Sequence, residues 1–376
     1  MKKKISLILI VVLAAVFAFS ACSQAPATTD AAESQNAPTE AAQASAEEST
    51  APAEPESKEG FVVGMINGYM GNGWRTQLSD AVVALANEYI DAGVMKELNV
   101  QNAGDDVNEQ IQIFRNMIAT KPDMIMIVPN SQTALNPVIE EAHDAGILVV
   151  CIDQPVTSEF AVNVALDQYD WGKQIADWFV KEIEGKGDII VLAGVAGGPS
   201  NVSRLQGQYD VLKQYPDIKV LTEVNGDWDQ GTAQTVMSNV LASYPNIDGV
   251  LTQDGMSLGT VKAFQAAGRE LPVISGETMV GFLRLWKELN QSEGLNTWAI
   301  NDPPSVSTAA LSIGIRLLQG KTPKEGTLKD NYFYYPVQVI IDNNNLDQYL
   351  DQYKDAEDTY FPDERLSEEA IDALFE

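Results

Sequence analysis

Apolar runs of strand length alternate with segments of helical periodicity along most of this chain, and this alternation most constrains its fold. The runs at 61–66, 124–128 and 147–152 are almost entirely apolar, as expected for strands that are buried on both faces. Between them, apolar residues recur at helical spacing, for example within 74–89. Strands that alternate with helices favour parallel sheets covered by helices, so we predict an α/β fold.

The same alternation occurs twice, which predicts two consecutive lobes. The first half has expected strands at 61–66, 99–101, 124–128 and 147–152, and expected helices at 74–89, 108–119 and 134–145. The second half has expected helices at 172–183, 203–214, 232–243 and 258–267, and expected strands at 188–192, 218–224, 249–251 and 272–274. The chain is too long for one small core, so we predict two doubly wound parallel-sheet lobes that share a cleft at the carboxyl ends of their strands.

The first residues indicate export from the cytoplasm. Three lysines at 2–4 precede an apolar run at 5–19, and small residues then lead to Cys22. This pattern is typical of a secretory signal and is too short for a membrane span. The Ser-Ala-Cys sequence resembles the bacterial lipobox, although Phe19 stands where leucine is usual, and a plain cleaved signal is the alternative. We predict a lipoprotein signal peptide at 1–22, with Cys22 as the lipid anchor on the outer side of the cell membrane.

The segment at 23–59 contains no aromatic residue and no Ile, Leu, Val or Met. Such a segment buries too little apolar surface to offset its ordering entropy. We therefore predict a disordered acidic tether between the lipid and the folded lobes.

Composition excludes several classes of function. The chain carries 53 acidic and 24 basic residues, a net charge of −29, whereas binding to nucleic acid requires a basic surface. His143 is the single histidine, and Cys151 lies in an apolar run where a small buried side chain is expected. These features argue against a metal site and against acid–base catalysis by histidine. We expect no cofactor, no metal and no enzymatic activity.

Polar and aromatic side chains gather just after the predicted strands. Amide and carboxylate groups hydrogen-bond hydroxyls, arginine donates to their lone pairs, and tryptophan offers a flat apolar face to a sugar ring. Asp and Asn at such positions also cap helices and close turns, which is the alternative for each. The candidate ligand-binding residues are Asn72, Trp74, Arg75, Asn130, Asp153, Gln154, Arg204, Trp228, Gln253, Asp254, Glu277 and Asn301.

Several stretches together carry a family resemblance. They are Asn72-Gly-Trp-Arg75, 147–153, Gly194-Val-Ala-Gly with Arg204-Leu-Gln-Gly207, Asp227-Trp-Asp229, 253–259 and Tyr334-Tyr-Pro-Val337. Over 60–345 the chain resembles the ribose-type solute-binding proteins of ABC sugar importers, which have the type I periplasmic-binding-protein fold. The resemblance implies a hinge of three chain crossovers. It implies a first lobe of 60–166 plus 303–334 and a second lobe of 167–301 plus 337–376, with the acidic tail in the second.

The resemblance also implies roles at the site. Trp74 and Trp228 would stack on a sugar, and Arg204 would hold its hydroxyls together with the carboxylate that follows the fourth strand. Four side chains depart from the ribose pattern, which argues against ribose: Arg75, Gln154, Gln253 and Glu277 stand where an aromatic residue, Arg, Asn and Asp are usual. The ligand stays open among other sugars, including galactofuranose, and sugar acids or phosphosugars.

The implied mechanism is hinge closure around the ligand by a monomer that delivers it to an ABC permease. A sensor that presents a signal sugar or autoinducer to a receptor kinase is the alternative. A glycosidase using Asp227 and Asp229 is disfavoured because no nucleophile motif accompanies them. Alanine at Trp74 or Arg204 is expected to abolish binding while leaving the melting temperature of the ligand-free protein nearly unchanged.

Overall fold

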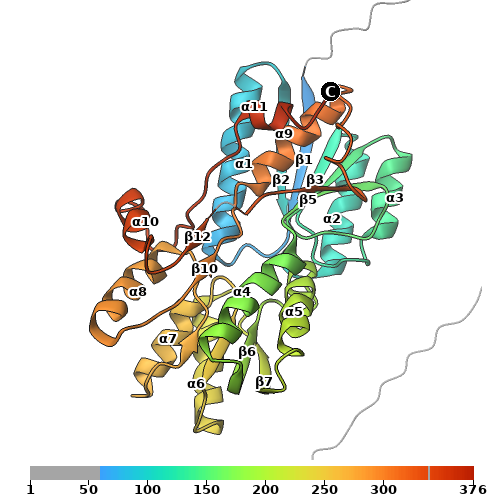
Figure 1. Ribbon diagram of the computed structural model, residues 1–376. Coiled ribbons are helices and arrows are strands. Elements are labelled where there is room, and N and C mark those ends of the chain that lie inside the picture. Colours follow the sequence, from blue (N-terminus) through green and yellow to red (C-terminus); the bar gives the residue numbers. More distant parts are fainter. Residues whose placement is uncertain (1–59, 338) are drawn as a thin grey trace, which may run out of the picture. The chain divides into compact units, whose positions relative to one another are not determined.

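The computed structural model describes residues 60–337 and 339–376, and these residues form two lobes, each with its own parallel sheet (Figure 1). The predicted α/β class is confirmed. The predicted signal peptide, its Cys22 and the tether of 23–59 lie outside the described residues. In the described part of the chain, no helix combines the length and apolar character that crossing a membrane requires.

The first lobe is built on a six-stranded sheet in the order β11-β5-β4-β3-β1-β2, in which all neighbouring strands are parallel. Its strands are β1 (Phe61–Asn67), β2 (Met95–Asn102), β3 (Met124–Ile127), β4 (Leu148–Ile152), β5 (Ala161–Ala165) and β11 (Tyr332–Tyr334). Strand β1 lies inside the sheet between β2 and β3, so the strand order reverses beside it. Ligands in sheets of this kind bind at such a reversal point, beyond the carboxyl ends of the strands.

Helices cover both faces of this sheet. Helices α1 (Gly73–Asp91) and α9 (Val306–Leu318) pack on one face, and α2 (Val107–Ala119) and α3 (Asn136–Asp144) pack on the other. Successive residues of β3 alternate between the two cores: Met124 and Met126 join the side of α1 and α9, whereas Ile125 and Ile127 join the side of α2 and α3. A strand buried on both faces needs an unbroken apolar run, which is why the sequence identified it.

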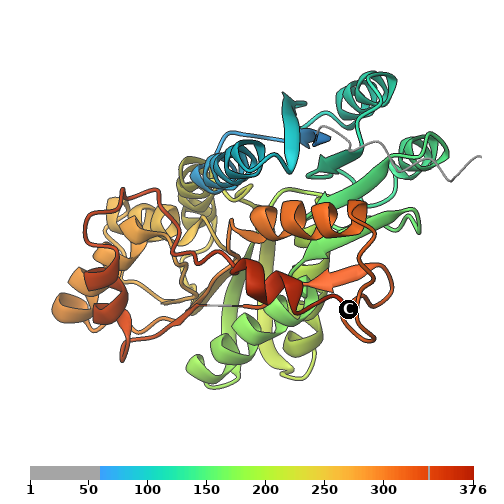
Figure 2. The same ribbon diagram turned by 90° about the horizontal axis from the view of Figure 1, so that it is seen from above.

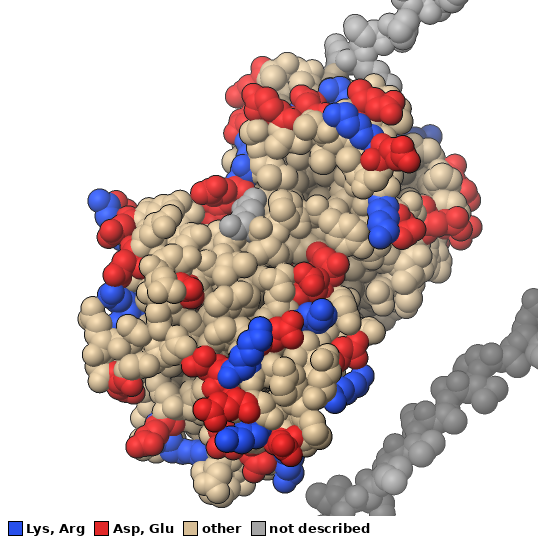
Figure 3. Space-filling model, in the orientation of Figure 1, with Lys and Arg blue, Asp and Glu red and all other residues tan. Residues whose placement is uncertain are grey.

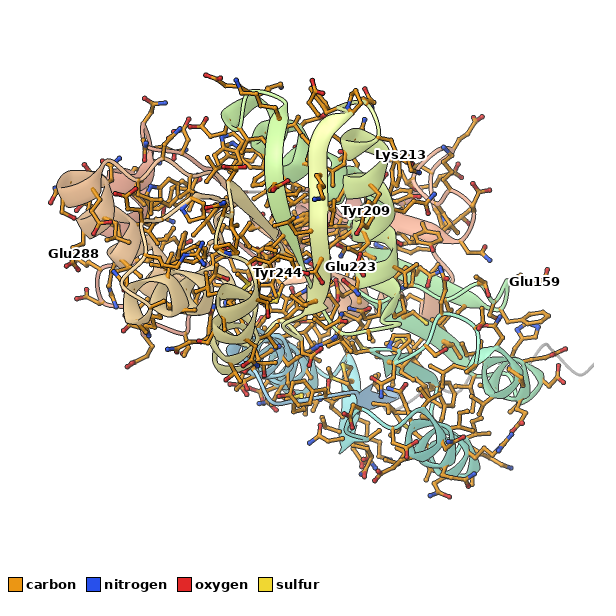
Figure 4. The ribbon with its side chains drawn as sticks, turned by 90° about the horizontal axis from the view of Figure 1, so that it is seen from below. Glu159, Tyr209, Lys213, Glu223, Tyr244 and Glu288 are labelled. Atoms are coloured by element: carbon orange, nitrogen blue, oxygen red, sulfur yellow. The ribbon has the colours of Figure 1, made fainter. Side chains whose placement is uncertain are left out.

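The second lobe repeats this arrangement with a four-stranded parallel sheet in the order β7-β6-β8-β9. The strands are β6 (Lys186–Ala193), β7 (Asp217–Asn225), β8 (Gly249–Thr252) and β9 (Val273–Ile274). The helices are α4 (Gln168–Glu182) and α5 (Pro199–Leu212) on one face, and α6 (Gln230–Ser243), α7 (Ser257–Ala266) and α8 (Val280–Glu293) on the other. On the edge strand β7, Glu223 accepts a hydrogen bond from Tyr209 of α5 on the outer side of the lobe (Figure 4).

Up to β12 (Ile340–Ile341), the chain passes between the lobes at three places. These are from β5 to α4, from β10 (Ala299–Ile300) to α9, and from β11 to β12. Strands β10 and β12 pair antiparallel with each other. One hydrophobic core includes Leu166, Ile300 and Tyr335, which lie at the three crossings. The crossings therefore share a common apolar packing.

The C-terminal segment departs from the expected division of the chain. Helix α10 (Leu346–Gln352) packs on α8 in the second lobe, but α11 (Glu368–Asp372) packs on α9 in the first lobe. Phe375 joins the first-lobe core, where its ring lies 5.8 Å from that of Phe333. The assignment of all of 337–376 to the second lobe is therefore wrong, because buried side chains fix the last residues to the first lobe. The chain crosses between the lobes a fourth time.

Two smaller predictions are also settled. Helix α4 begins at Gln168 rather than near residue 172, because the side chain of Asp167 caps it by accepting from the backbone N–H of Asp170 at 2.9 Å. Cys151 is 1% exposed, as predicted for a small buried side chain, and burial raises the pKa of its thiol.

Candidate binding site

A cavity lies between the two lobes. Its lining comes from loops and helix starts that follow the carboxyl ends of strands in both sheets, as the fold requires. The lining residues are Asn72, Trp74, Arg75, Asp153, Gln154, Ser200, Arg204, Trp228, Asp254, Gly255, Asp302 and Phe361.

Arg204, in α5, is the centre of the polar network. Its side chain is 3% exposed and forms ion pairs with Asp302 and, at 3.8 Å, with Asp254. Its Nε donates to Oε1 of Gln168 at 2.7 Å. The guanidinium also lies 4.0 Å from the ring centre of Trp171, which gives a cation–π contact. Arg204 is therefore held in one position before any ligand arrives.

Asp153 follows β4 and has a left-handed backbone conformation, with φ at 60°. Such a conformation is uncommon for a residue with a side chain, and it concentrates at functional sites. The carboxylate accepts from Nε2 of Gln168 at 2.9 Å and from Nε2 of Gln154 at 2.8 Å. Burial raises the pKa of Asp153 to about 8, and the nearby Asp302 adds to the effect.

The start of α1 contributes three lining residues. Asn72 caps the helix by accepting from the backbone N–H of Arg75 at 2.9 Å. Nε1 of Trp74 donates to the backbone oxygen of Asp302 at 2.6 Å, which fixes the indole beside the hinge. Burial lowers the pKa of Arg75, while Asp153 and Asp302 partly offset the effect. The cap thus orients this helix end toward the cavity.

Several buried polar atoms of the lining have no hydrogen-bond partner among the described residues. They are Nη1 of Arg75, both carboxylate oxygens of Asp254 and Oδ1 of Asp302. A buried polar group without a partner costs free energy. Donors and acceptors left open in one cavity therefore indicate a ligand that both donates and accepts hydrogen bonds.

Trp228 forms the second-lobe wall of the cavity. Its backbone is left-handed, with φ at 53°, which is unusual for so bulky a residue. Its Nε1 donates to Oε1 of Gln253 at 2.9 Å, and Nε2 of Gln253 donates to Oδ1 of Asn201 at 2.8 Å. Gln253 therefore positions the tryptophan from behind rather than lining the cavity.

The lobes touch each other around the cavity. Nδ2 of Asn72 donates to the backbone oxygen of Trp228 at 3.3 Å. On the opposite side, the backbone N–H of Ser200 donates to Oε1 of Gln154 at 2.9 Å, and its hydroxyl donates to the backbone oxygen of Asp153 at 3.1 Å. These contacts join first-lobe loops to second-lobe loops, as expected for a closed arrangement.

Most of the sequence-predicted residues line this cavity: Asn72, Trp74, Arg75, Asp153, Gln154, Arg204, Trp228 and Asp254. Four do not line it. Gln253 lies behind Trp228, and Glu277 and Asn301 hold backbone groups of the fold. Asn130 lines the wider interlobe cleft that adjoins this cavity at Asn72, Arg75, Gln154 and Trp228. Nδ2 of Asn130 donates to the backbone oxygen of Gly104 at 2.9 Å, and Oδ1 of Asn301 accepts from the backbone N–H of Val339 at 3.1 Å near the hinge.

Glu277 is the clearest correction. Its carboxylate accepts from the backbone N–H groups of Ser257 and Leu258 at 3.3 and 3.1 Å and from Nε2 of Gln230. It therefore holds the start of α7, a position that favours a negative charge. Burial nevertheless raises its pKa to about 7.

Sequence reasoning missed Ser200, Gly255, Asp302 and Phe361. Asp302 directly follows the predicted Asn301, and the structure turns the aspartate rather than the asparagine toward the cavity. Ser200 lies at the start of α5, one turn before Arg204, where a helix start after a strand is a usable signal. Phe361 comes from the C-terminal segment and has no local signal of this kind.

Comparison with known proteins agrees with this geometry. Residues 63–322 match the periplasmic binding protein domain family. A xylitol-binding protein of Mycolicibacterium smegmatis is 31% identical over 258 residues, which cover 67% of this chain and 70% of the relative. The galactofuranose-binding protein of Escherichia coli is 28% identical over 206 residues, and the match spans only 63% of its length and 52% of this chain.

Among solved structures, an ABC transporter solute-binding protein from Thermobispora bispora is similar with a TM-score of 0.75 and 28% identity. The match covers 83% of this chain and 94% of that protein. The chain therefore belongs to the periplasmic binding protein family.

The raised pKa of Asp153 predicts a pH dependence of stability. An unfolded aspartate has a pKa of about 3.9, so the folded state binds more protons than the unfolded state between about pH 4 and 8. The free energy of unfolding contributed by this group therefore falls as the pH rises through that window. Asp153→Asn removes the titration. From pH 4 to 8 we expect the melting temperature of ligand-free Asp153→Asn to gain at least about 2–4 °C relative to the parent protein, the shift that each 1 kcal/mol gives.

Thermal melting of both proteins from pH 4 to 9 measures this difference. Asp210→Asn on the outer side of the second lobe is the control, because its carboxylate is exposed and its pKa is lowered by Lys213 and Tyr169. If the melting temperatures of the parent and Asp153→Asn differ by the same amount at every pH, the raised pKa of Asp153 is contradicted.

Proposed function

We propose that this protein captures a neutral polyhydroxylated solute, a monosaccharide or a sugar alcohol, outside the cytoplasm and delivers it to an ABC permease. The observation that carries the proposal is the interlobe cavity, with unpartnered donors and acceptors between two tryptophans, Trp74 and Trp228. A sugar ring presents hydroxyls at its edge and C–H groups on its faces, so it matches this combination. The xylitol-binding and galactofuranose-binding relatives support the same class of ligand.

The charge balance of the cavity supports a neutral ligand. Arg75 and Arg204 are the basic residues of the lining, and three carboxylates, Asp153, Asp254 and Asp302, accompany them. Arg204 is already paired with Asp302 and Asp254. Arg75 is the remaining basic residue of the lining, and burial lowers its pKa, so the cavity offers little positive charge to a sugar acid or phosphosugar.

Hinge closure is the proposed mechanism. Ligand bound to one lobe gains hydrogen bonds from the other as the lobes close, so binding shifts the population toward the closed form. The bonds that Ser200 forms with Gln154 and Asp153 would hold that form. No catalytic step is proposed, because the lining lacks histidine and its carboxylates are engaged in ion pairs or held by glutamine amides.

We also propose that the protein acts as a monomer and is held to the membrane by a lipid on Cys22. Acidic and basic side chains are interspersed on the face seen in Figure 3, with no broad basic surface there for nucleic acid. A sensor would use the same cavity, but the relatives named as ribose and D-apiose import binding proteins favour delivery to a permease.

A thermal-shift panel tests the ligand class. At a free concentration of about 100 times Kd, a ligand stabilises the folded state by about 2.7 kcal/mol, which is roughly 5–10 °C in melting temperature for a protein of this size. We expect such a shift with at least one neutral pentose, hexose or sugar alcohol, and none with matched uronic acids or sugar phosphates. Arg115→Ala, at the surface of the first lobe and outside the cleft, should respond like the parent.

Small-angle scattering with the best ligand then tests closure, and titration calorimetry gives the affinity. No shift with any neutral sugar or polyol, or a larger shift with the anionic compounds, would overturn the proposed ligand class. Loss of uptake of that sugar on deletion of the gene from its cell tests delivery to a permease.

A further inference from the structure

Residues 353–367, which we call the strap, carry the chain from α10 on the second lobe to α11 on the first (Figures 1 and 2). This is the fourth crossing between the lobes. Phe361, in its middle, is 5% exposed and lines the cavity beside residues of both lobes. The strap therefore links the two lobes and also contributes a side chain to the binding cavity.

The strap is fastened to the second lobe at the start of α8. The backbone oxygen of Asp358 accepts from the N–H of Gly281 at 2.8 Å, and that of Tyr360 accepts from the N–H of Val280 at 2.9 Å. Arg284 forms an ion pair with Asp358 and donates to the backbone oxygen of Ala356 at 2.9 Å. Helix α8 has no side-chain cap of its own, so the strap satisfies its first N–H groups.

The strap is fastened to the first lobe in a similar way. Gln77 of α1 donates to the backbone oxygen of Phe361 at 2.9 Å and accepts from its N–H at 3.0 Å. The carboxylate of Asp363 accepts from the backbone N–H of Ser305 at 2.8 Å at the start of α9, which also lacks a side-chain cap from its own N-cap residue. Beyond the strap, Glu368 of α11 accepts from Tyr89 and Arg316 at 2.8 Å.

A single peptide group joins the two sets of contacts. The carbonyl of Tyr360 accepts from Val280 in the second lobe, and the N–H of Phe361 in the same peptide unit donates to Gln77 in the first. A peptide unit is planar and rigid, so these two bonds cannot be separated by stretching the chain between them. Opening the lobes at this point must break one of them or pivot about the strap.

Two glycines make room for the strap, one in each lobe. A Cβ on Gly73, at the start of α1, would approach the backbone oxygen of Thr359 to 2.9 Å. A Cβ on Gly281, at the start of α8, would approach Cβ and the backbone oxygen of Asp358 to 3.0 Å. Both helix starts therefore lie against consecutive strap residues, which indicates close packing on each side.

We propose that the strap is a functional part of the binding site, in which Phe361 contacts the ligand as a third aromatic wall and its backbone bonds hold the lobes in register around the ligand. This proposal rests on the proposed function. Phe361 then helps to determine specificity, because an aromatic face favours ligands with an apolar C–H surface. The hydrogen bonds between its backbone and Gln77 fix the position of the ring in the cavity.

The test compares three variants by titration calorimetry with the neutral sugars that bind the parent. Phe361→Ala removes the wall, and we expect about a tenfold or greater rise in Kd together with an altered order of preference among the sugars. Gln77→Ala removes both bonds to the Phe361 backbone without changing any side chain of the lining, and we expect a smaller rise in Kd. Tyr360→Ala is the matched control, because its ring packs against Tyr353, at 5.6 Å, rather than lining the cavity.

The outcomes separate the two proposals. A parent that binds no neutral sugar overturns the proposed function and, with it, the contact of Phe361 with ligand. A parent that binds, with Phe361→Ala equal to it in both affinity and preference, overturns the strap proposal alone. If Tyr360→Ala weakens binding as much as Phe361→Ala does, the effect comes from loosening the tail, and the aromatic wall is rejected.

Discussion

Replacing Arg204 with alanine is expected to abolish detectable sugar binding and to lower the free energy of unfolding of the ligand-free protein by about 3–5 kcal/mol. Arg204 is almost fully buried, and its loss leaves Asp302 as a buried carboxylate without its ion-pair partner. It also removes the cation–π contact with Trp171. The sequence-based expectation of an unchanged melting temperature for this variant is therefore revised by the ion pairs.

Denaturant unfolding measures the stability and calorimetry measures the binding. Arg115→Ala is the control, because its ion pair with Glu141 lies at the surface, where solvent screens it and it adds little to stability. The double variant Arg204→Met with Asp302→Asn should recover part of the stability and none of the binding. If Arg204→Ala loses no more free energy of unfolding than Arg115→Ala does, the buried ion pairs of Arg204 do not stabilise the ligand-free protein.

Replacing Trp228 with alanine is expected to weaken sugar binding by about 2–4 kcal/mol, roughly 30-fold to 1,000-fold, with a much smaller effect on the ligand-free protein. Its indole is only partly buried, and it forms one wall of the cavity. Its left-handed backbone is set by the loop, so alanine at this position adds no new backbone strain. Trp74→Ala should affect the ligand-free protein more than Trp228→Ala does, because the indole of Trp74 also donates a hydrogen bond to the backbone oxygen of Asp302 beside the hinge.

Trp178→Ala in α4 is the matched control for Trp228→Ala. It removes the same volume from a partly buried position that packs on the core and lies outside the cavity. We expect it to lower stability and to leave affinity unchanged. Equal affinity losses for the two variants in a sugar titration would show that the Trp228 ring has no direct contact with ligand.

The sheet cores were predictable from sequence because buried parallel strands need unbroken apolar runs. Met124 to Ile127 illustrates this, since every side chain of β3 is buried. Strand β11 gave no comparable signal, because it has only three residues and its position depends on pairing with β5, far away in the chain. Short elements placed by long-range contacts are where local patterns fail.

Part of the site was predictable for a different reason. Polar residues at strand ends converge in a doubly wound sheet, so Asp153 and Trp228 could be expected to meet. The same residue types also cap helices, and the sequence cannot separate the two uses. Glu277 shows this, because backbone N–H groups at the start of α7 bind the carboxylate that was expected to bind ligand. Phe361 was missed because only the return of the tail to the first lobe brings it to the cavity.

The path of the tail also decides which labels can report movement of the lobes. Strand β1, where the described chain begins, and Phe375, near its end, belong to the same lobe, and the N–H of Glu376 donates to the backbone oxygen of Thr322 in that lobe. Fluorophores attached near residue 61 and near residue 376 would keep a constant separation while the hinge moves. A biosensor made from this protein would need one of its fluorophores inserted in the second lobe, for example after α6.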